Sequence, residues 1–188
     1  TACLPRPLPP RVRAAILTRV AQLSSRAHEI AELAATIGRE FTFDVLAHAY
    51  GADIDHASAD IASGDEDALI RGLDELWQRR IVREQGTEAY DFSHDKLREV
   101  TYARLSKARR RLLHRRVAHA LEAVYADNLD SVAARVAAHC ERAGQSEQAI
   151  HYYRRAAEVA RQIQATELAN RYDQRVSALL QGTTVDES

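Results

Sequence analysis

All four prolines of this 188-residue chain lie within its first ten residues, and only seven glycines are spread along the whole sequence. Proline and glycine are the residues that most often interrupt helices and form the tight turns of β-sheet proteins. A chain that lacks proline after residue 10 is therefore expected to fold mainly into helices joined by short loops.

Apolar residues recur every three or four positions in the first half of the chain, which is the spacing of one buried helical face. Ser25 can cap the second of the resulting helices, and Gly38 is suited to end it in a left-handed conformation. The predicted helices cover residues 12–23, 26–37, 41–50 and 66–79, and a polar loop is expected over residues 51–64.

Two short apolar segments, residues 81–84 and 88–92, flank Gln85-Gly86-Thr87 and predict a β-hairpin. Three helices followed by a hairpin is the order of a winged-helix domain. A further helix should start directly behind the hairpin, with Ser93 or Asp91 as its N-cap.

From Ser106 onward the apolar rhythm predicts helices over residues 106–124, 131–143, 146–163 and 165–180, with Gly144 ending the second. Ala149, Tyr153 and Ala156 have the spacing of the second helix of a tetratricopeptide repeat. The same pattern returns only in part at Leu168 and Tyr172. The expected fold is mostly α: a connecting arm (1–24), a winged-helix domain with a small β-hairpin (25–105) and antiparallel tetratricopeptide-like helical hairpins (106–188).

Composition limits the function classes. The net charge of −1 gives no global attraction to nucleic acid or to an anionic membrane. Two cysteines, Cys3 and Cys140, cannot form a disulfide framework, and no secretory leader or membrane-length apolar run occurs, so we expect a cytoplasmic protein. The chain contains no methionine and opens on a proline-rich segment, which suggests a piece of a longer polypeptide.

His94 and Asp95 stand at the predicted start of the helix behind the hairpin. A helix N-terminus presents N–H groups without intrahelical partners and a partial positive charge, so it attracts anions. His94 could add one more donor to a bound phosphate there, or it could cap its own helix and pack against Phe92.

The order of these elements resembles the region behind the ATPase core of signal-transduction ATPases with numerous domains. The resemblance covers nearly the whole chain from about Val12. It is carried by Ala34-Ala-Thr-Ile-Gly-Arg-Glu-Phe41, Leu69-Ile-Arg-Gly-Leu-Asp-Glu-Leu76, Phe92-Ser-His-Asp-Lys-Leu-Arg-Glu99, Arg111-Leu-Leu-His-Arg-Arg-Val-Ala118, the pair Ala138-His139 and the repeat helix from Ala149 to Ala160.

In related apoptotic and plant-immunity ATPases, a Met-His-Asp motif of the winged-helix domain holds ADP through its histidine. The resemblance implies that His94 contacts an ADP phosphate in the full-length protein and that Asp95 is its structural neighbour, with Ser93 in the methionine position. The full-length protein would use ATP or ADP with Mg. This chain has no GxxxxGK[ST] loop, so by itself it should bind no cofactor.

The family resemblance also implies partners: an ATPase domain upstream in the same chain, and a protein or small molecule on the helical repeats. In the bacterial branch the output is often a transcription factor or a nucleotide cyclase. The densest basic run is usually a solvated helix face, but it could dock an acidic partner or an anionic ligand. Its six cations are Lys107, Arg109, Arg110, Arg111, Arg115 and Arg116.

Two other functions compete with a regulatory module. The chain could be a DNA-binding winged helix with a helical arm for dimerisation, in which the helix at residues 66–79 enters the major groove. Against this, its acidic residues Glu66, Asp67, Asp74 and Glu75 would face the phosphates. The chain could also be the regulatory part of a nucleotide cyclase or kinase. It contains no hydrolase, metalloprotease or Cys-x-x-Cys motif and no histidine pair with metal-ligand spacing, so we expect neither catalysis nor a metal site within it.

Overall fold

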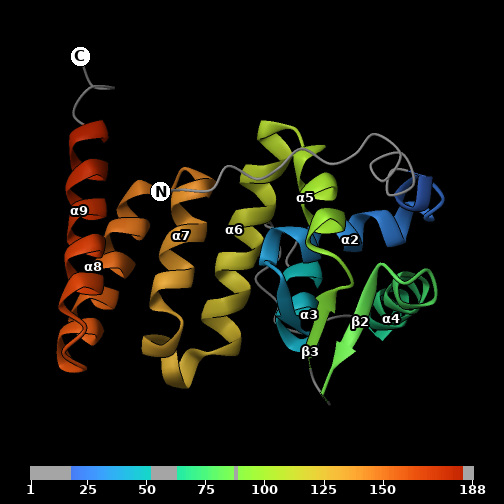
Figure 1. Ribbon diagram of the computed structural model, residues 1–188, viewed down its shortest axis with the longest axis horizontal. Coiled ribbons are helices and arrows are strands. Elements are labelled where there is room, and N and C mark those ends of the chain that lie inside the picture. The colour runs from blue at the N-terminus through green and yellow to red at the C-terminus, as the bar shows by residue number, and fades with distance from the viewer. Residues whose placement is uncertain (1–17, 52–62, 87–88, 184–188) are drawn as a thin grey trace. The chain divides into compact units, whose positions relative to one another are not determined.

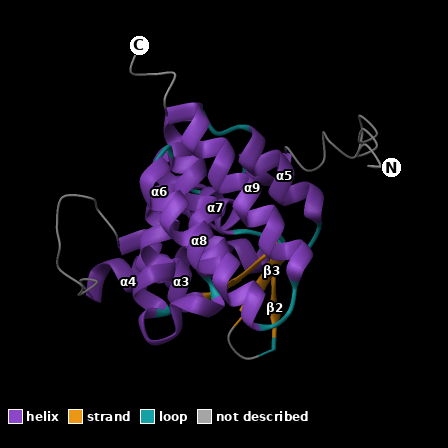
Figure 2. Cartoon of the chain, turned by 90° about the vertical axis from the view of Figure 1, so that its left-hand side faces the viewer, coloured by secondary structure: helices purple, strands orange, loops and turns teal. Residues whose placement is uncertain are grey.

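The computed structural model describes residues 18–51, 63–86 and 89–183 (Figure 1). As the sequence predicts, this part of the chain is mostly helical, and its strands form one small antiparallel sheet (Figure 2). The elements are α2 (Ser25–Ile37), β1 (Glu40–Thr42), α3 (Phe43–Gly51), α4 (Ser63–Gln78), β2 (Val82–Gln85), β3 (Ala89–Phe92), α5 (Asp95–Ala103), α6 (Lys107–Val124), the 3-10 helix η1 (Ala126–Ser131), α7 (Ala133–Ala143), α8 (Ser146–Gln162) and α9 (Thr166–Thr183).

The chain divides into two compact units. The first comprises residues up to Phe43 and from Ala62 to Leu105, and the second comprises Asp44–Ile61 and Ser106–Ser188. Among the described elements, α2, β1, α4, β2, β3 and α5 belong to the first unit. Nearly all of α3, together with η1 and the helices from α6 to α9, belongs to the second.

The sheet of the first unit has the strand order β1-β3-β2, and both strand pairs are antiparallel. The predicted hairpin is confirmed: Val82 of β2 lies opposite Phe92 of β3. The third strand, β1, was not predicted, because residues 41–50 were expected to form one helix. The chain instead pairs Phe41 with Tyr90 before α3 begins at Phe43, and three residues are too few for a strand pattern to appear in the sequence.

The core of the first unit lies where α2 packs against α4 and α5. Its largest buried side chains include Ile30, Leu69, Leu76 and Leu97, all less than 2% exposed. Gly72 of α4 permits the close approach, because a Cβ at this position would overlap the Cδ1 atom of Ile30. The apolar spacing that predicted these helices is therefore the spacing of their contact surfaces.

Three predicted helix ends need correction. The N-cap of α2 is Ser24, whose Oγ accepts a hydrogen bond from the Ala27 N–H at 3.2 Å, and not Ser25. Gly38 follows α2 as predicted, but with φ 155° and ψ −159° it is not in the left-handed helical region. The N-cap of α5 is His94, so neither Ser93 nor Asp91 takes that position.

In the second unit, α6, α7, α8 and α9 pack consecutively in chain order (Figure 1). Ser106 caps α6 by accepting the Arg109 N–H, and Gly144 ends α7 at φ 82°, the predicted left-handed cap. The helix expected over residues 131–143 is shorter, since η1 occupies the residues before α7. Ala149, Tyr153 and Ala156 of α8 are buried, as a helix that packs on both sides requires.

One carboxylate ties three helices of this unit together. Glu141 of α7 accepts the Tyr153 hydroxyl of α8 at 2.8 Å and the guanidinium of Arg175 in α9. Residues 12–17 of the first predicted helix, the central part of the predicted loop (residues 52–62) and Cys3 lie outside the described residues.

Candidate functional site at the start of α5

The segment that leads into α5 is fixed by backbone hydrogen bonds. The Ser93 N–H donates to the Ile81 carbonyl at 2.9 Å, and the Phe92 N–H donates to the Arg39 carbonyl at 3.3 Å. These bonds attach the end of β3 to the residue before β2 and to the residue before β1. The start of α5 therefore has a position set by the sheet.

His94 is the last residue before α5 and has the extended backbone of an N-cap, with φ −145° and ψ 134°. Its carbonyl accepts the Leu97 N–H at 2.9 Å, but its side chain makes no capping hydrogen bond. The residue is exposed, unlike the buried Phe92 two positions earlier. The imidazole thus stands at the positive end of the helix with its donor available to an external acceptor.

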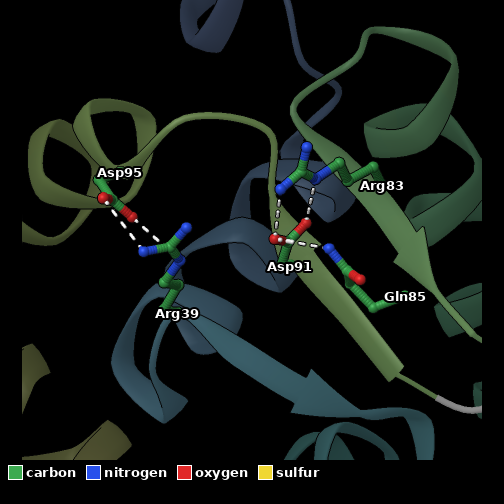
Figure 3. A network of polar contacts seen from close by, with 5 residues as sticks. All are labelled: Arg39, Arg83, Gln85, Asp91 and Asp95. Carbon is green, nitrogen blue, oxygen red and sulfur yellow. Dashed lines mark hydrogen bonds and ion pairs between the residues drawn. The ribbon is translucent and has the colours of Figure 1, made fainter.

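Asp95 lies in the first turn of α5, where a carboxylate interacts favourably with the helix dipole. Its two oxygens face the guanidinium of Arg39, with Nε 3.4 Å from Oδ1 and Nη1 3.5 Å from Oδ2 (Figure 3). Both side chains are more than half exposed, at 59% and 53%. Arg39 therefore brings a guanidinium to the same helix end as His94.

Asp91, three residues before His94, belongs to a separate hydrogen-bond network in the sheet (Figure 3). Its carboxylate is buried and accepts hydrogen bonds from Arg83 Nε at 2.6 Å, Arg83 Nη2 at 2.8 Å and Gln85 Nε2 at 3.2 Å. The hydrogen bonds from Arg83 lower the pKa of the Asp91 carboxyl below its usual value. Asp91 is thus a structural anion of the hairpin.

Sequence reasoning identified His94 and Asp95 but not Arg39. The Arg39 and Asp95 positions are 56 residues apart, and only the pairing of β1 with β3 brings them together. A short helix-to-strand connection leaves no periodic pattern, so the sequence contained no local signal for this contact.

The predicted docking patch divides between two environments on α6. Lys107, Arg111 and Arg115 are exposed, whereas Arg109, Arg110 and Arg116 are half-buried and make further interactions within the protein. The six cations of the basic run therefore do not form one solvent-facing surface.

Two histidines of the second unit meet in its interior, which the sequence did not predict. His114 of α6 and His139 of α7 are 2% and 5% exposed, with their Nδ1 atoms 2.8 Å apart. Burial, together with the nearby cations Arg142 and Arg110, lowers the pKa of His114 to about 4. A donor and an acceptor nitrogen can face each other only while at least one ring is neutral.

Cys140, next to His139, is a buried free thiol, and burial raises its pKa to about 11. A thiol held in its protonated form is a poor nucleophile and a poor metal ligand. Among the described residues there is no group of three or more His, Cys, Asp or Glu side chains arranged to hold a metal ion.

The outer surface of α4 combines acidic and apolar side chains. Glu66, Asp67 and Asp74 are exposed, and so are Ile70 and Trp77 at 41% and 52%. Such a surface would repel a phosphate backbone.

Glu75 of α4 and Arg79, the residue directly after α4, are engaged within the first unit. Glu75 accepts hydrogen bonds from the Ser24 backbone and hydroxyl, and Arg79 donates to Glu75 and Gln22. Arg79 therefore contributes little free positive charge near the end of α4.

Within the described residues, no helix is both long and apolar enough to cross a membrane. No family model, no curated protein and no solved structure matches this chain.

Proposed function

We propose that this chain is a non-catalytic regulatory module of a multidomain signal-transduction ATPase. In this proposal the first unit is a winged-helix domain that closes on an ADP-bound ATPase core. The second unit is a set of tetratricopeptide-like helices that receives a protein or small-molecule signal and controls an output such as transcription.

The topology of the first unit supports the winged-helix part of the proposal. In chain order the elements are α2, β1, α3, α4, β2 and β3, and β1 joins the hairpin through β3, which is the element order of a winged helix. Most of α3, however, groups with the second unit. The consecutive packing of α6 to α9 through small buried residues supports the repeat part, since tetratricopeptide helices approach closely at such positions.

The observation that carries the proposal is that His94 is exposed and its side chain makes no capping hydrogen bond. A histidine that only capped its own helix would accept a hydrogen bond from a first-turn N–H group, and the His94 side chain makes no such bond. Because the residue is exposed at a helix N-terminus beside Arg39, its N–H can donate to an anion presented by another domain.

The N–H of His94 and the nearby guanidinium of Arg39 suit the diphosphate of ADP, whose oxygens accept charge-assisted hydrogen bonds. The residues of this chain would supply one side of that site, and the ATPase core would supply the phosphate-binding loop. The hydrogen bond from His94 would hold the two domains together, so that its loss favours their separation.

The test compares ADP affinity in the polypeptide that contains both the core and this chain. His94→Ala should weaken ADP binding, because one charge-assisted hydrogen bond is lost. His119→Ala is the matched control, since His119 is an exposed histidine of the second unit.

DNA binding by α4 is the alternative. The exposed acidic side chains of α4 and the engagement of Arg79 with Glu75 disfavour it. A salt titration of the chain with duplex DNA separates the alternatives, because a DNA-binding domain would show a steep dependence on salt.

A further inference from the structure

The exposed side of α6 carries a row of cations at helical spacing. Lys107, Arg111 and Arg115 follow one another at intervals of four residues, and all three are exposed. Four residues of an α-helix rise about 6 Å, so the three charges are regularly spaced along one side of the helix. We call these three residues the basic ridge.

The opposite side of α6 is fixed in the core of the second unit. Leu113, Val117 and Leu121 are at most 2% exposed, and α6 packs against α7. The basic ridge therefore faces away from this buried side and cannot turn inward without unfolding the helix.

Several acidic side chains of this unit form ion pairs with arginines outside the ridge. Glu141 pairs with Arg175, while Asp130 and Asp173 pair with arginines of α8. No ion pair found among the described residues involves the basic ridge. Residues 106–183 contain 13 Lys and Arg against 8 Asp and Glu, so this part of the chain is positive although the whole chain is not.

The central cation of the ridge lies close to the end of the neighbouring helix. The guanidinium of Arg111 lies against Gly144, where an added Cβ would be 3.9 Å from Nε and 4.0 Å from Cζ. Gly144 is the left-handed cap of α7, next to the carbonyl groups at the negative end of that helix.

We propose that the basic ridge is a docking site for an acidic segment of a protein partner, with carboxylates at intervals of about 6 Å. Arginine binds carboxylates through two parallel hydrogen bonds. A nucleic acid fits less well, because proteins that bind single strands stack the bases mainly on Phe, Tyr and Trp, and α6 contains none of these three. This proposal rests on the proposed function, because it names the class of partner that the helical unit would bind.

The experiment measures binding of a fluorescent helical peptide of about 20 residues with Glu at every fourth position. The ridge variant Lys107→Glu/Arg111→Glu/Arg115→Glu is compared with Arg135→Glu/Arg154→Glu/Arg171→Glu. The second variant changes the net charge equally, at exposed arginines of α7, α8 and α9. A peptide with Gln in place of Glu and a single-stranded oligonucleotide serve as competitors.

We expect saturable binding of the Glu peptide that the ridge variant weakens by at least about tenfold and the control variant by less than about threefold. Equal losses in both variants would overturn the proposal, since they would mean attraction by net charge alone. Absence of saturable binding, or tighter ridge-dependent binding of the oligonucleotide, would overturn it as well. The ridge variant should not change the ADP affinity of the polypeptide that contains the ATPase core. The docking proposal can therefore be overturned while the proposed ADP contact of His94 stands, and the ADP contact can be overturned while the docking proposal stands.

Discussion

Arg83 of β2 and Asp91 of β3 lie directly opposite each other in the sheet and are joined by two hydrogen bonds of 2.6 and 2.8 Å. The arginine side chain is 53% exposed, whereas that of Asp91 is only 2% exposed. The Asp91 carboxylate is thus a buried charge that needs the Arg83 guanidinium to compensate it. Asp91 lies two residues before Ser93, where the chain leaves the sheet toward His94. This pair fixes the register of the hairpin that carries the candidate site.

Arg83→Ala should therefore destabilise the protein by about 1–3 kcal/mol, because it leaves a buried carboxylate with only Gln85 as a side-chain donor. The double variant Arg83→Ala/Asp91→Asn should cost less than the sum of the single variants, since the buried charge is gone. Urea unfolding of the four proteins gives the coupling energy directly. Strictly additive losses would mean that the two side chains do not depend on each other.

The same pair predicts how stability changes with acid. Arg83 lowers the pKa of Asp91 in the folded protein. The stabilisation that the ionised Asp91 carboxylate gives the folded state is therefore complete above the ordinary carboxyl pKa, and it is lost as the pH falls through the lowered value. Asp91→Asn should remove this part of the acid sensitivity.

Gly72 tests the packing of α2 against α4. Helix propensity alone would make Gly72→Ala stabilising by roughly 1 kcal/mol. The new Cβ would overlap Cδ1 of the fully buried Ile30, and overpacking costs about 1–3 kcal/mol, so we expect a net loss of stability. Gly182→Ala is the control, because no atom lies within 4 Å of an added Cβ there. A stabilised Gly72→Ala protein would show that the two helices are not in close contact.

His114 predicts a second pH dependence of stability. Its folded pKa of about 4 lies below the value near 6.5 expected for an unfolded chain, so the folded state binds fewer protons between these pH values. Stability is then full above pH 6.5 and falls as the pH decreases toward 4, by roughly 2 kcal/mol between pH 7 and pH 5. Urea titrations at both pH values should show a smaller difference for His114→Leu, while the exposed His119→Leu should leave it unchanged.

The helices were predictable because the information for them is local. Residues such as Leu69, Leu73 and Leu76 repeat at the spacing of one helical face, whatever that face later contacts. Ser24 and Ser25 are equivalent caps in the sequence, and only the hydrogen bonds of Ser24 to Glu75 of α4 distinguish them.

The missed features all depend on contacts between distant residues. The strand β1 exists because it pairs with β3, and the contact of Arg39 with Asp95 follows from that pairing. His114 and His139 meet because α6 packs against α7. Neither histidine has a neighbour in sequence that would reveal its partner.

The most direct test of the proposed function is the dissociation constant of ADP for the polypeptide that contains the ATPase core and this chain, measured by calorimetry with and without His94→Ala. We expect ADP binding to weaken by about tenfold to a hundredfold in His94→Ala, the loss of one charge-assisted hydrogen bond, with partial recovery in His94→Gln, which retains an N–H donor. The control His119→Ala should bind ADP as the unaltered protein does. An unchanged dissociation constant in His94→Ala would contradict the account.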